Sequence, residues 1–216
     1  PDADPDDTFP QSVASGGPTP EGVICWTRVA PDRFDPELTL AVEVATDPEF
    51  TDPVYRGLID DAESIFAHDY TVKVDLDGHL DSDSEYHYRF VYDGVASRTG
   101  RCRTLPAPDA SPDSLRIAVL TCQNYLNGYF PAYHHVAEEE LDFMVHLGDF
   151  VYESATGDFK GIGSPEFEGR DLSLPSGYDR VHTLEDYRYL YRTYRADEFL
   201  QEAMESHTLI AGWDDH

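Results

Sequence analysis

Five side chains that are potential metal ligands follow three short apolar runs in the second half of the chain. The runs are residues 115–120, 143–147 and 208–213, and the side chains that follow them are Cys122, Asp149, Tyr152, Asp215 and His216. One Gly-Asp pair after an apolar run is usually only a turn with a solvated carboxylate. Three runs that end in this way indicate a common site instead.

Short strands of an α/β sheet are the elements that would position these side chains. The nearly continuous apolar run at residues 143–147 is typical of a central strand that is buried on both faces of a sheet. In open α/β sheets, ligands bind just beyond the carboxyl ends of the strands. Gly148 permits a close turn there, so we expect Asp149 and Tyr152 to share one metal ion.

The first hundred residues show the pattern of an all-β domain. Segments with alternating apolar side chains, separated by turns rich in Pro, Gly and Asp, lie at residues 23–29, 38–45, 54–59, 70–76, 85–92 and 97–104. We expect Trp26 in the core of this domain, and Tyr86 has the placement of a tyrosine corner. The predicted fold class is a β-sandwich of immunoglobulin or fibronectin type over residues 9–104.

The second half of the chain predicts an α/β domain. Residues 105–114 lack apolar periodicity and indicate a linker. In residues 115–216 strands alternate with helices, which predicts a parallel sheet. The long loop at residues 154–182 is expected to overhang the site, since loops of this length are usually functional or mobile.

The helix that follows this loop is expected to begin at Thr183, with Asp186 completing an approximate capping box. An aromatic stripe at helical spacing predicts core packing; it consists of Leu184, Tyr187, Tyr191 and Tyr194. A second face carries Arg188, Arg192 and Arg195, which we expect to pair with carboxylates.

Charge is the most unusual property of the composition. The 216 residues include 43 acidic and 15 basic side chains, which gives a net charge of −28. Proteins bind nucleic acids through Lys and Arg, so this surface argues against a nucleic-acid partner and against binding to an anionic membrane. Self-repulsion of acidic side chains is a property of salt-adapted proteins, and we interpret the chain as halophilic.

The two ends of the chain indicate processing. No run approaches the roughly 20 apolar residues that cross a bilayer, and the N-terminus has no signal-peptide pattern. We expect that any export signal has been removed, and that the chain, which stops at His216 directly after an apolar run, is a fragment. Three cysteines allow at most one internal disulfide, and the pairing of Cys25 with Cys102 stays open.

Four motifs in order resemble the PhoD-like alkaline phosphatase and phosphodiesterase family, which is related to purple acid phosphatases. They are FPQSVASG at residues 9–16, TCQN at 121–124, GDFVYE at 148–153 and WDDH at 213–216. Together with shorter matches between them, they cover nearly the whole chain. One departure is Gly17, where the family commonly has aspartate.

The resemblance implies metal-dependent hydrolysis of small-molecule or polymeric phosphate esters with Fe3+ and Ca2+ as cofactors. Asp149 is similar to a carboxylate that bridges two metals, while Tyr152 and Cys122 would be a phenolate and a thiolate on ferric iron. Asp215 stands where the wider superfamily has a metal-binding asparagine. His216 would contact phosphate or donate a proton, whereas a role for the neighbouring Asp214 is less certain.

The resemblance also implies export by the twin-arginine route to the extracellular space or cell surface, and we expect a monomer. Family members carry further histidine ligands downstream, so we expect an incomplete, inactive site in this chain. The alternative function is a secreted calcium-binding β-sandwich module with a degenerate α/β segment. Bound iron with a tyrosinate absorption band favours the phosphoesterase, and calcium alone favours the module.

Overall fold

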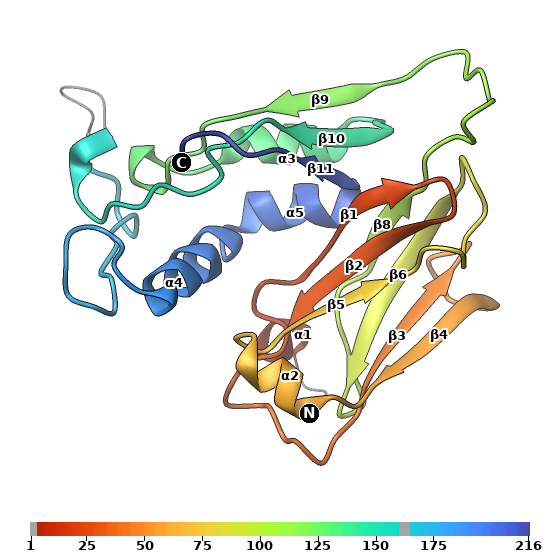
Figure 1. Ribbon diagram of the computed structural model, residues 1–216, viewed down its shortest axis with the longest axis horizontal. Coiled ribbons are helices and arrows are strands. Elements are labelled where there is room, and N and C mark those ends of the chain that lie inside the picture. Colours follow the sequence, from red (N-terminus) through yellow and green to blue (C-terminus); the bar gives the residue numbers. More distant parts are fainter. Residues whose placement is uncertain (1–3, 160–164) are drawn as a thin grey trace.

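The computed structural model describes residues 4–159 and 165–216 of the chain, whose helices and strands are shown in Figure 1. The predicted loop at residues 154–182, including Lys160, therefore falls partly outside the described residues. The strands are β1 Val13–Thr19, β2 Gly22–Arg28, β3 Leu40–Ala45, β4 Pro53–Ile59, β5 Thr71–Asp75, β6 Glu85–Tyr92, β7 Val95–Ala96, β8 Gly100–Arg103, β9 Ile117–Leu120, β10 Phe143–His146 and β11 Leu209–Ala211. The helices are α1 Pro5–Thr8, α2 Ala62–Ala67, α3 Pro131–Glu138, α4 Leu184–Arg195 and α5 Glu198–Ser206, with short 3-10 turns η1 Tyr125–Asn127 and η2 Gly157–Phe159.

The strands of the first half lie in two sheets that enclose a common core. One sheet has the order β4-β3-β6-β7, with β8 also paired to β6, and β1, β2 and β5 belong to the other. Val23 and Cys25 from β2 pack in one apolar cluster with Tyr88 and Phe90 from β6. This is the layered arrangement that the alternating pattern predicts, while its assignment to the immunoglobulin or fibronectin type stays a prediction.

Two details of this core concern residues singled out in the sequence. The hydroxyl oxygen of Tyr86 accepts a hydrogen bond from the backbone N–H of Asp81 at 2.9 Å, which is the backward contact of a tyrosine corner. Cys25 and Cys102 are both buried in the core and both are free thiols.

Strand β1, which the sequence analysis does not predict, joins the two halves of the chain. It pairs antiparallel with β2 and parallel with β11, where Gly16 lies opposite Leu209. The second sheet therefore runs continuously in the order β5-β2-β1-β11-β10-β9. A Cβ atom on Gly16 would lie 3.0 Å from the carbonyl oxygen of Leu209, so the missing side chain permits this close approach.

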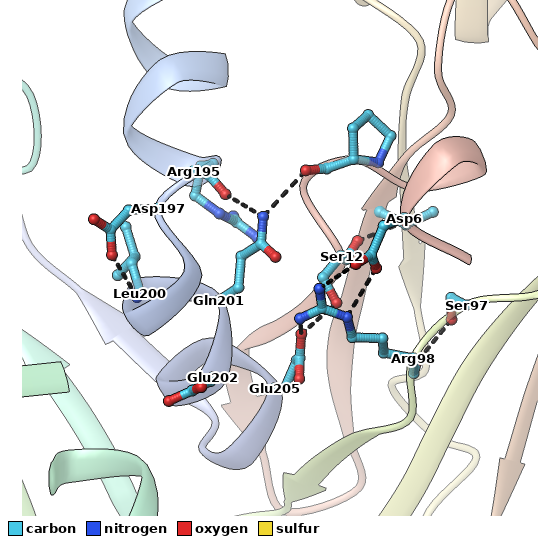
Figure 2. A network of polar contacts seen from close by, with 12 residues as sticks. Asp6, Ser12, Ser97, Arg98, Arg195, Asp197, Leu200, Gln201, Glu202 and Glu205 are labelled. Atoms are coloured by element: carbon cyan, nitrogen blue, oxygen red, sulfur yellow. Dashed lines mark hydrogen bonds and ion pairs between the residues drawn. The ribbon is translucent and has the colours of Figure 1, made fainter. Parts of the chain in front are cut away.

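Polar contacts fix α5 against the N-terminal segment (Figure 2). Glu205 accepts hydrogen bonds from the hydroxyl of Ser12 at 2.5 Å and from Arg98 at 3.1 Å. Arg98 also pairs with Asp6 at 2.7 Å. The side-chain amide of Gln201 donates to the carbonyl oxygen of Pro10 at 3.1 Å. Both sheet pairing and these contacts therefore hold the second half against the first.

Trp26 does not lie in the sandwich core, contrary to the prediction. It is partly buried and packs with the second apolar cluster of the molecule, beside Ala14, on the opposite face of β2 from Cys25. The guanidinium carbon of Arg195 lies 4.1 Å from the centroid of the Trp26 ring. Alternation along a strand places Trp26 and Cys25 on opposite faces, and the face with Trp26 belongs to the junction of the two halves.

The prediction of core packing for the stripe on α4 is confirmed for Tyr194 and wrong for its other three residues. Leu184, Tyr187 and Tyr191 are 66%, 44% and 38% exposed, whereas Leu190 and Tyr194 are fully buried. The helical spacing predicts which residues share a face of α4, but it does not predict that this face is buried. Tyrosines are amphipathic and also occupy exposed faces. The capping box of Thr183 and Asp186 at the start of α4 is confirmed.

The prediction that β10 is buried on both faces is confirmed for one face and only in part for the other, where Phe143 is buried but Val145 is only partly buried. Met144 packs in one apolar cluster with Ala203 and Met204 of α5, the helix that lies under β10 in Figure 1. On the opposite face Val145 pairs with Val119 and Ile210, which are 63% and 37% exposed. Within the described ranges, no helix covers this second face.

Candidate metal centre

The carboxyl ends of three parallel strands bring the candidate ligands to one edge of the sheet. β9, β10 and β11 are paired in parallel, with His146 opposite Leu120 and Ala211. The backbone N–H of Leu147 continues the pairing to the carbonyl of Leu120 at 2.9 Å. Because the strands end together, the segments that begin at Cys122, Asp149 and Asp214 lie side by side.

Gly148 allows the segment after β11 to approach the segment after β10. Its φ of 130° disfavours other residues, and a Cβ atom there would lie 2.5 Å from the backbone nitrogen of Asp214. Asp149 and Cys122 follow in the left-handed region, with φ of 55° and 58°. Such conformations are uncommon for residues other than glycine and cluster at functional sites.

The carboxylate of Asp149 is the meeting point of the candidate ligands. It is only 6% exposed. One of its oxygens accepts hydrogen bonds from the hydroxyl of Tyr152 at 3.1 Å and from the thiol of Cys122 at 3.5 Å. The other oxygen accepts from the backbone N–H of His216 at 3.2 Å. Three chain segments thus converge on this side chain.

Asp215 and His216 complete a group of potential ligands around Asp149. One ligand atom from each of these three residues lies within 4.8 Å of the other two. The Nδ1 atom of His216 lies 2.9 Å from a carboxylate oxygen of Glu153, so a proton on Nδ1 leaves Nε2 as the basic nitrogen. The sequence analysis gives His216 a catalytic role, and the structure places it where a ligand role is also available. Asp214 is not part of this group.

Electrostatics favour the neutral forms of two side chains near Asp149. Burial, followed by hydrogen bonds with Cys122 and Asp149, raises the pKa of Tyr152 well above its ordinary value. Burial lowers the pKa of His146, and the charge of Asp149 opposes this effect. The neutral phenol of Tyr152 donates its proton to the carboxylate of Asp149. A cation in this position would take the place of that proton.

Three residues at the site were missed by the sequence analysis. Glu153 contacts His216, and it is the last residue of the GDFVYE motif. His146 is buried, and its Nε2 atom has no hydrogen-bond partner among the residues described; it was hidden inside an apolar run. The hydroxyl of Tyr194 accepts hydrogen bonds from the backbone N–H groups of Tyr125 and Tyr152, both at 3.2 Å. The sequence pattern predicts that Tyr194 packs in the core, but it does not indicate that the hydroxyl reaches these two backbone groups.

The described parts of the loop at residues 154–182 lie partly over the site and partly in the core. The ring of Phe159 lies 4.4 Å from that of His216, centroid to centroid. Further along, Leu172 and Leu174 are buried in the second apolar cluster, and Arg170 pairs with Asp197 at the start of α5. Near the end of the loop, Arg180 lies 3.6 Å from the carboxylate of Glu153 and 5.3 Å from the centroid of the Phe159 ring. Among the described residues, the first and last parts of the loop therefore lie at the site, and its middle part packs in the core.

Comparisons with known proteins give the same family for both halves. Residues 1–106 match the model of the PhoD-like phosphatase N-terminal domain, and residues 117–216 match that of the PhoD-like phosphatase. Alkaline phosphatase D of Bacillus subtilis (strain 168) is 36% identical over 221 residues, which is 96% of this chain and 35% of that protein. A solved structure of PhoD superposes with a TM-score of 0.81 at 32% identity and covers 97% of this chain and 39% of that one. This chain therefore spans little more than a third of these relatives.

Proposed function

Since this chain belongs to the PhoD-like phosphatase family, we propose that it carries part of the metal centre of an enzyme that hydrolyses phosphate esters. The observation that best supports the proposal is the convergence of Tyr152, Cys122 and the backbone of His216 on the carboxylate of Asp149. A buried carboxylate that receives a phenol and a thiol at one oxygen has the donor set of a transition-metal site.

The donor types fit ferric iron next to a divalent cation, such as calcium, that binds oxygen ligands. Tyr152 and Cys122 would hold the iron as phenolate and thiolate, and Asp149 would bridge to the second ion. Asp215 would provide a further carboxylate ligand for that second ion. Calcium takes about six to eight oxygen ligands, so Asp149 and Asp215 would have to be supplemented by further ligands. When bound, such ions polarise a phosphoryl oxygen and stabilise the charge of the transition state.

The other side chains of the site have distinct roles in this proposal. His216, oriented by Glu153 at 2.9 Å, would contact the phosphoryl group or donate a proton to the leaving oxygen. Phe159 and Tyr152 lie against the ring of His216, at centroid distances of 4.4 and 4.5 Å, and restrict its rotation. Tyr194 fixes the backbone of Tyr152, so that the phenol oxygen stays near Asp149.

The metals, the location and the oligomeric state of the protein are also proposals. Ferric iron and calcium, an extracellular or cell-surface location and a monomeric state are proposed from the family resemblance. The described residues include no helix that is long and apolar enough to cross a membrane. The calcium-binding module is the competing proposal, and it requires neither Tyr152 nor Cys122 as a ligand.

Hydrolysis of an aryl phosphodiester by the gene product that contains these residues tests the proposal. We expect activity that is lost on chelation and returns with metal, and a visible absorption band that disappears in Tyr152→Phe. Tyr178→Phe, at a tyrosine that is 60% exposed, is the matched control and should keep both. Calcium binding with no iron, no band and no hydrolysis would favour the module.

A further inference from the structure

A cavity separate from the candidate ligand group lies between α4 and the strands β2 and β5. Its volume is about 440 Å3, and its lining combines aromatic and arginine side chains, among them Trp26, Tyr187, Tyr191, Arg192 and Arg195. A smaller cavity of about 270 Å3, which reaches Asp149 and His216, shares Tyr191 and Arg195 with it. Arg195 therefore borders both cavities.

Two of the other arginines at the larger cavity already have carboxylate partners. Arg28 lies 3.1 Å from Asp69. Arg192 lies 2.8 Å from the same carboxylate and 2.7 Å from Glu185. Of the three arginines of α4 that the sequence predicts to pair with carboxylates, only Arg192 does so, whereas Arg188 donates to the backbone carbonyl of Ala67 at 2.5 Å. The charges of Arg28 and Arg192 are compensated within the protein.

Arg195 differs from them because it has no such partner. Its Nε and Nη2 atoms are buried, and neither has a hydrogen-bond partner in residues 4–159 and 165–216. Burial lowers the pKa of Arg195 to about 10, so it is still charged at neutral pH. The nearby carboxylate of Glu205 is bound to Ser12 and Arg98 instead.

The contact with Trp26 compensates Arg195 only in part. The guanidinium carbon lies 4.1 Å from the ring centroid, a distance at which the ring face attracts a cation. This attraction does not satisfy the N–H groups of the guanidinium, and buried donors without acceptors are rare in folded proteins. A carboxylate or phosphate group would supply the missing acceptors, because a guanidinium binds such a group with two parallel hydrogen bonds.

We propose that this cavity is a binding site for an organic oxyanion, that is, a phosphate or carboxylate attached to an apolar group, and that Arg195 binds the oxyanion. The apolar group would contact Leu184, Tyr187 and Tyr191, which line the cavity and are exposed on α4. Two of the four arginines at this cavity, Arg188 and Arg195, form no ion pair within the described residues. In a chain with a net charge of −28, they make the cavity a local region that attracts anions.

This proposal does not depend on the metal centre, and the experiment keeps the two apart. Metal is removed from the 216-residue chain with a chelator, so that phosphate cannot bind through a metal ion. Trp213, which is 88% exposed, is replaced by phenylalanine, which leaves Trp26 as the only tryptophan of the two in the chain. Its fluorescence then reports binding next to Arg195 at constant ionic strength.

The probes are phenyl phosphate and inorganic phosphate. We expect a saturable change in Trp26 fluorescence, with phenyl phosphate bound about tenfold more tightly, because its ring adds apolar burial. Arg195→Gln should weaken the binding of phenyl phosphate at least about tenfold, the scale of one charge-assisted contact. Arg56→Gln removes an arginine of β4 whose side chain is 67% exposed, and it should leave binding unchanged.

Three results would overturn the proposal: no saturable response to either probe, equal affinities for the two probes, or equal binding by Arg195→Gln. Circular dichroism checks that this variant folds. If it does not, Arg195→Lys keeps the positive charge but not the two parallel N–H donors. Weaker binding by Arg195→Lys supports the proposal, and unchanged binding contradicts it.

Discussion

Asp149 holds three chain segments together through its two carboxylate oxygens. Tyr152 and Cys122 share one oxygen, and the backbone N–H of His216 binds the other. Cys122 follows β9 and His216 follows β11, whereas Tyr152 lies in the turn after Asp149 itself. In the proposed two-metal site, a change at Asp149 would affect both ions, whereas a change at Tyr152 or Cys122 would affect one.

His216 is expected to act on the reaction more than on metal content. We predict that His216→Ala retains most of its metal and lowers the turnover number by about 100-fold or more, since positioned proton donors contribute about 10²–10⁴-fold. Metal analysis and steady-state kinetics of the gene product measure the two effects. His182→Ala, at an exposed histidine of the loop before α4, is the control. Equal loss of metal and activity in His216→Ala would make this residue a ligand.

At the scale of the elements, the turn after β10 determines how closely the segment after β11 approaches. Gly148 has a φ of 130°, and a Cβ atom there would lie 2.5 Å from the backbone nitrogen of Asp214. We predict that Gly148→Ala displaces residues 213–216 and costs about 1–3 kcal/mol in backbone strain. The bound metal content should fall because Asp215 and His216 move away from Asp149.

Gly94→Ala is the matched control for Gly148→Ala. Gly94 also has a positive φ, of 74°, but nothing lies within 4 Å of a Cβ atom at this position. Gly94→Ala should therefore cost about 1–2 kcal/mol in backbone strain without loss of bound metal. Urea unfolding gives the cost, and metal analysis gives the site occupancy. Full metal content in Gly148→Ala would show that the approach of Asp214 is not needed.

The elements also show what the sequence could and could not predict. β6 spans Glu85–Tyr92 as predicted, because its side chains alternate strictly between core and surface. β1 was missed, since Gly16 and Gly17 have no side chains to show a pattern, and its pairing with β11 is a contact between distant segments. The pattern predicts one helix between the long loop and the last strand, whereas the structure has two. The second, α5, begins after its N-cap Asp197.

The candidate site was predictable where local pattern determines position. The rule that ligands lie at the carboxyl ends of parallel strands was enough to predict that Cys122, Asp149 and Asp215 would lie near one another. Contacts that depend on tertiary packing were not predictable. Tyr194 reaches the backbone of Tyr152 from α4, and Arg195 lies over Trp26 rather than beside a carboxylate.

At the scale of the whole molecule, the excess of acidic side chains determines how the fold responds to salt. With 43 acidic and 15 basic side chains, most carboxylates have no cationic partner. Salt shortens the screening length from about 10 Å at 0.1 M to about 3 Å at 1 M, and because carboxylates outnumber cations it weakens repulsion between carboxylates more than attraction within ion pairs. We predict that the melting temperature rises between roughly 0.1 and 2 M potassium chloride.

Thermal unfolding followed by circular dichroism measures this effect. The same series in a neutral osmolyte separates screening of charge from general stabilisation by excluded solutes. A melting temperature that does not change with potassium chloride would rule out the halophilic interpretation of the composition.

The metal content of Asp149→Asn tests the central claim most directly. The substitution preserves the size of the side chain and removes the charge on which Tyr152, Cys122 and the backbone of His216 converge. Metal analysis and the visible spectrum of the purified gene product, compared with Asp179→Asn in the exposed loop before α4, give the result. We predict that Asp149→Asn loses both metals and the tyrosinate band, while Asp179→Asn keeps them. Full metal content and an unchanged band in Asp149→Asn would contradict the account and reduce Asp149 to a residue of the turn.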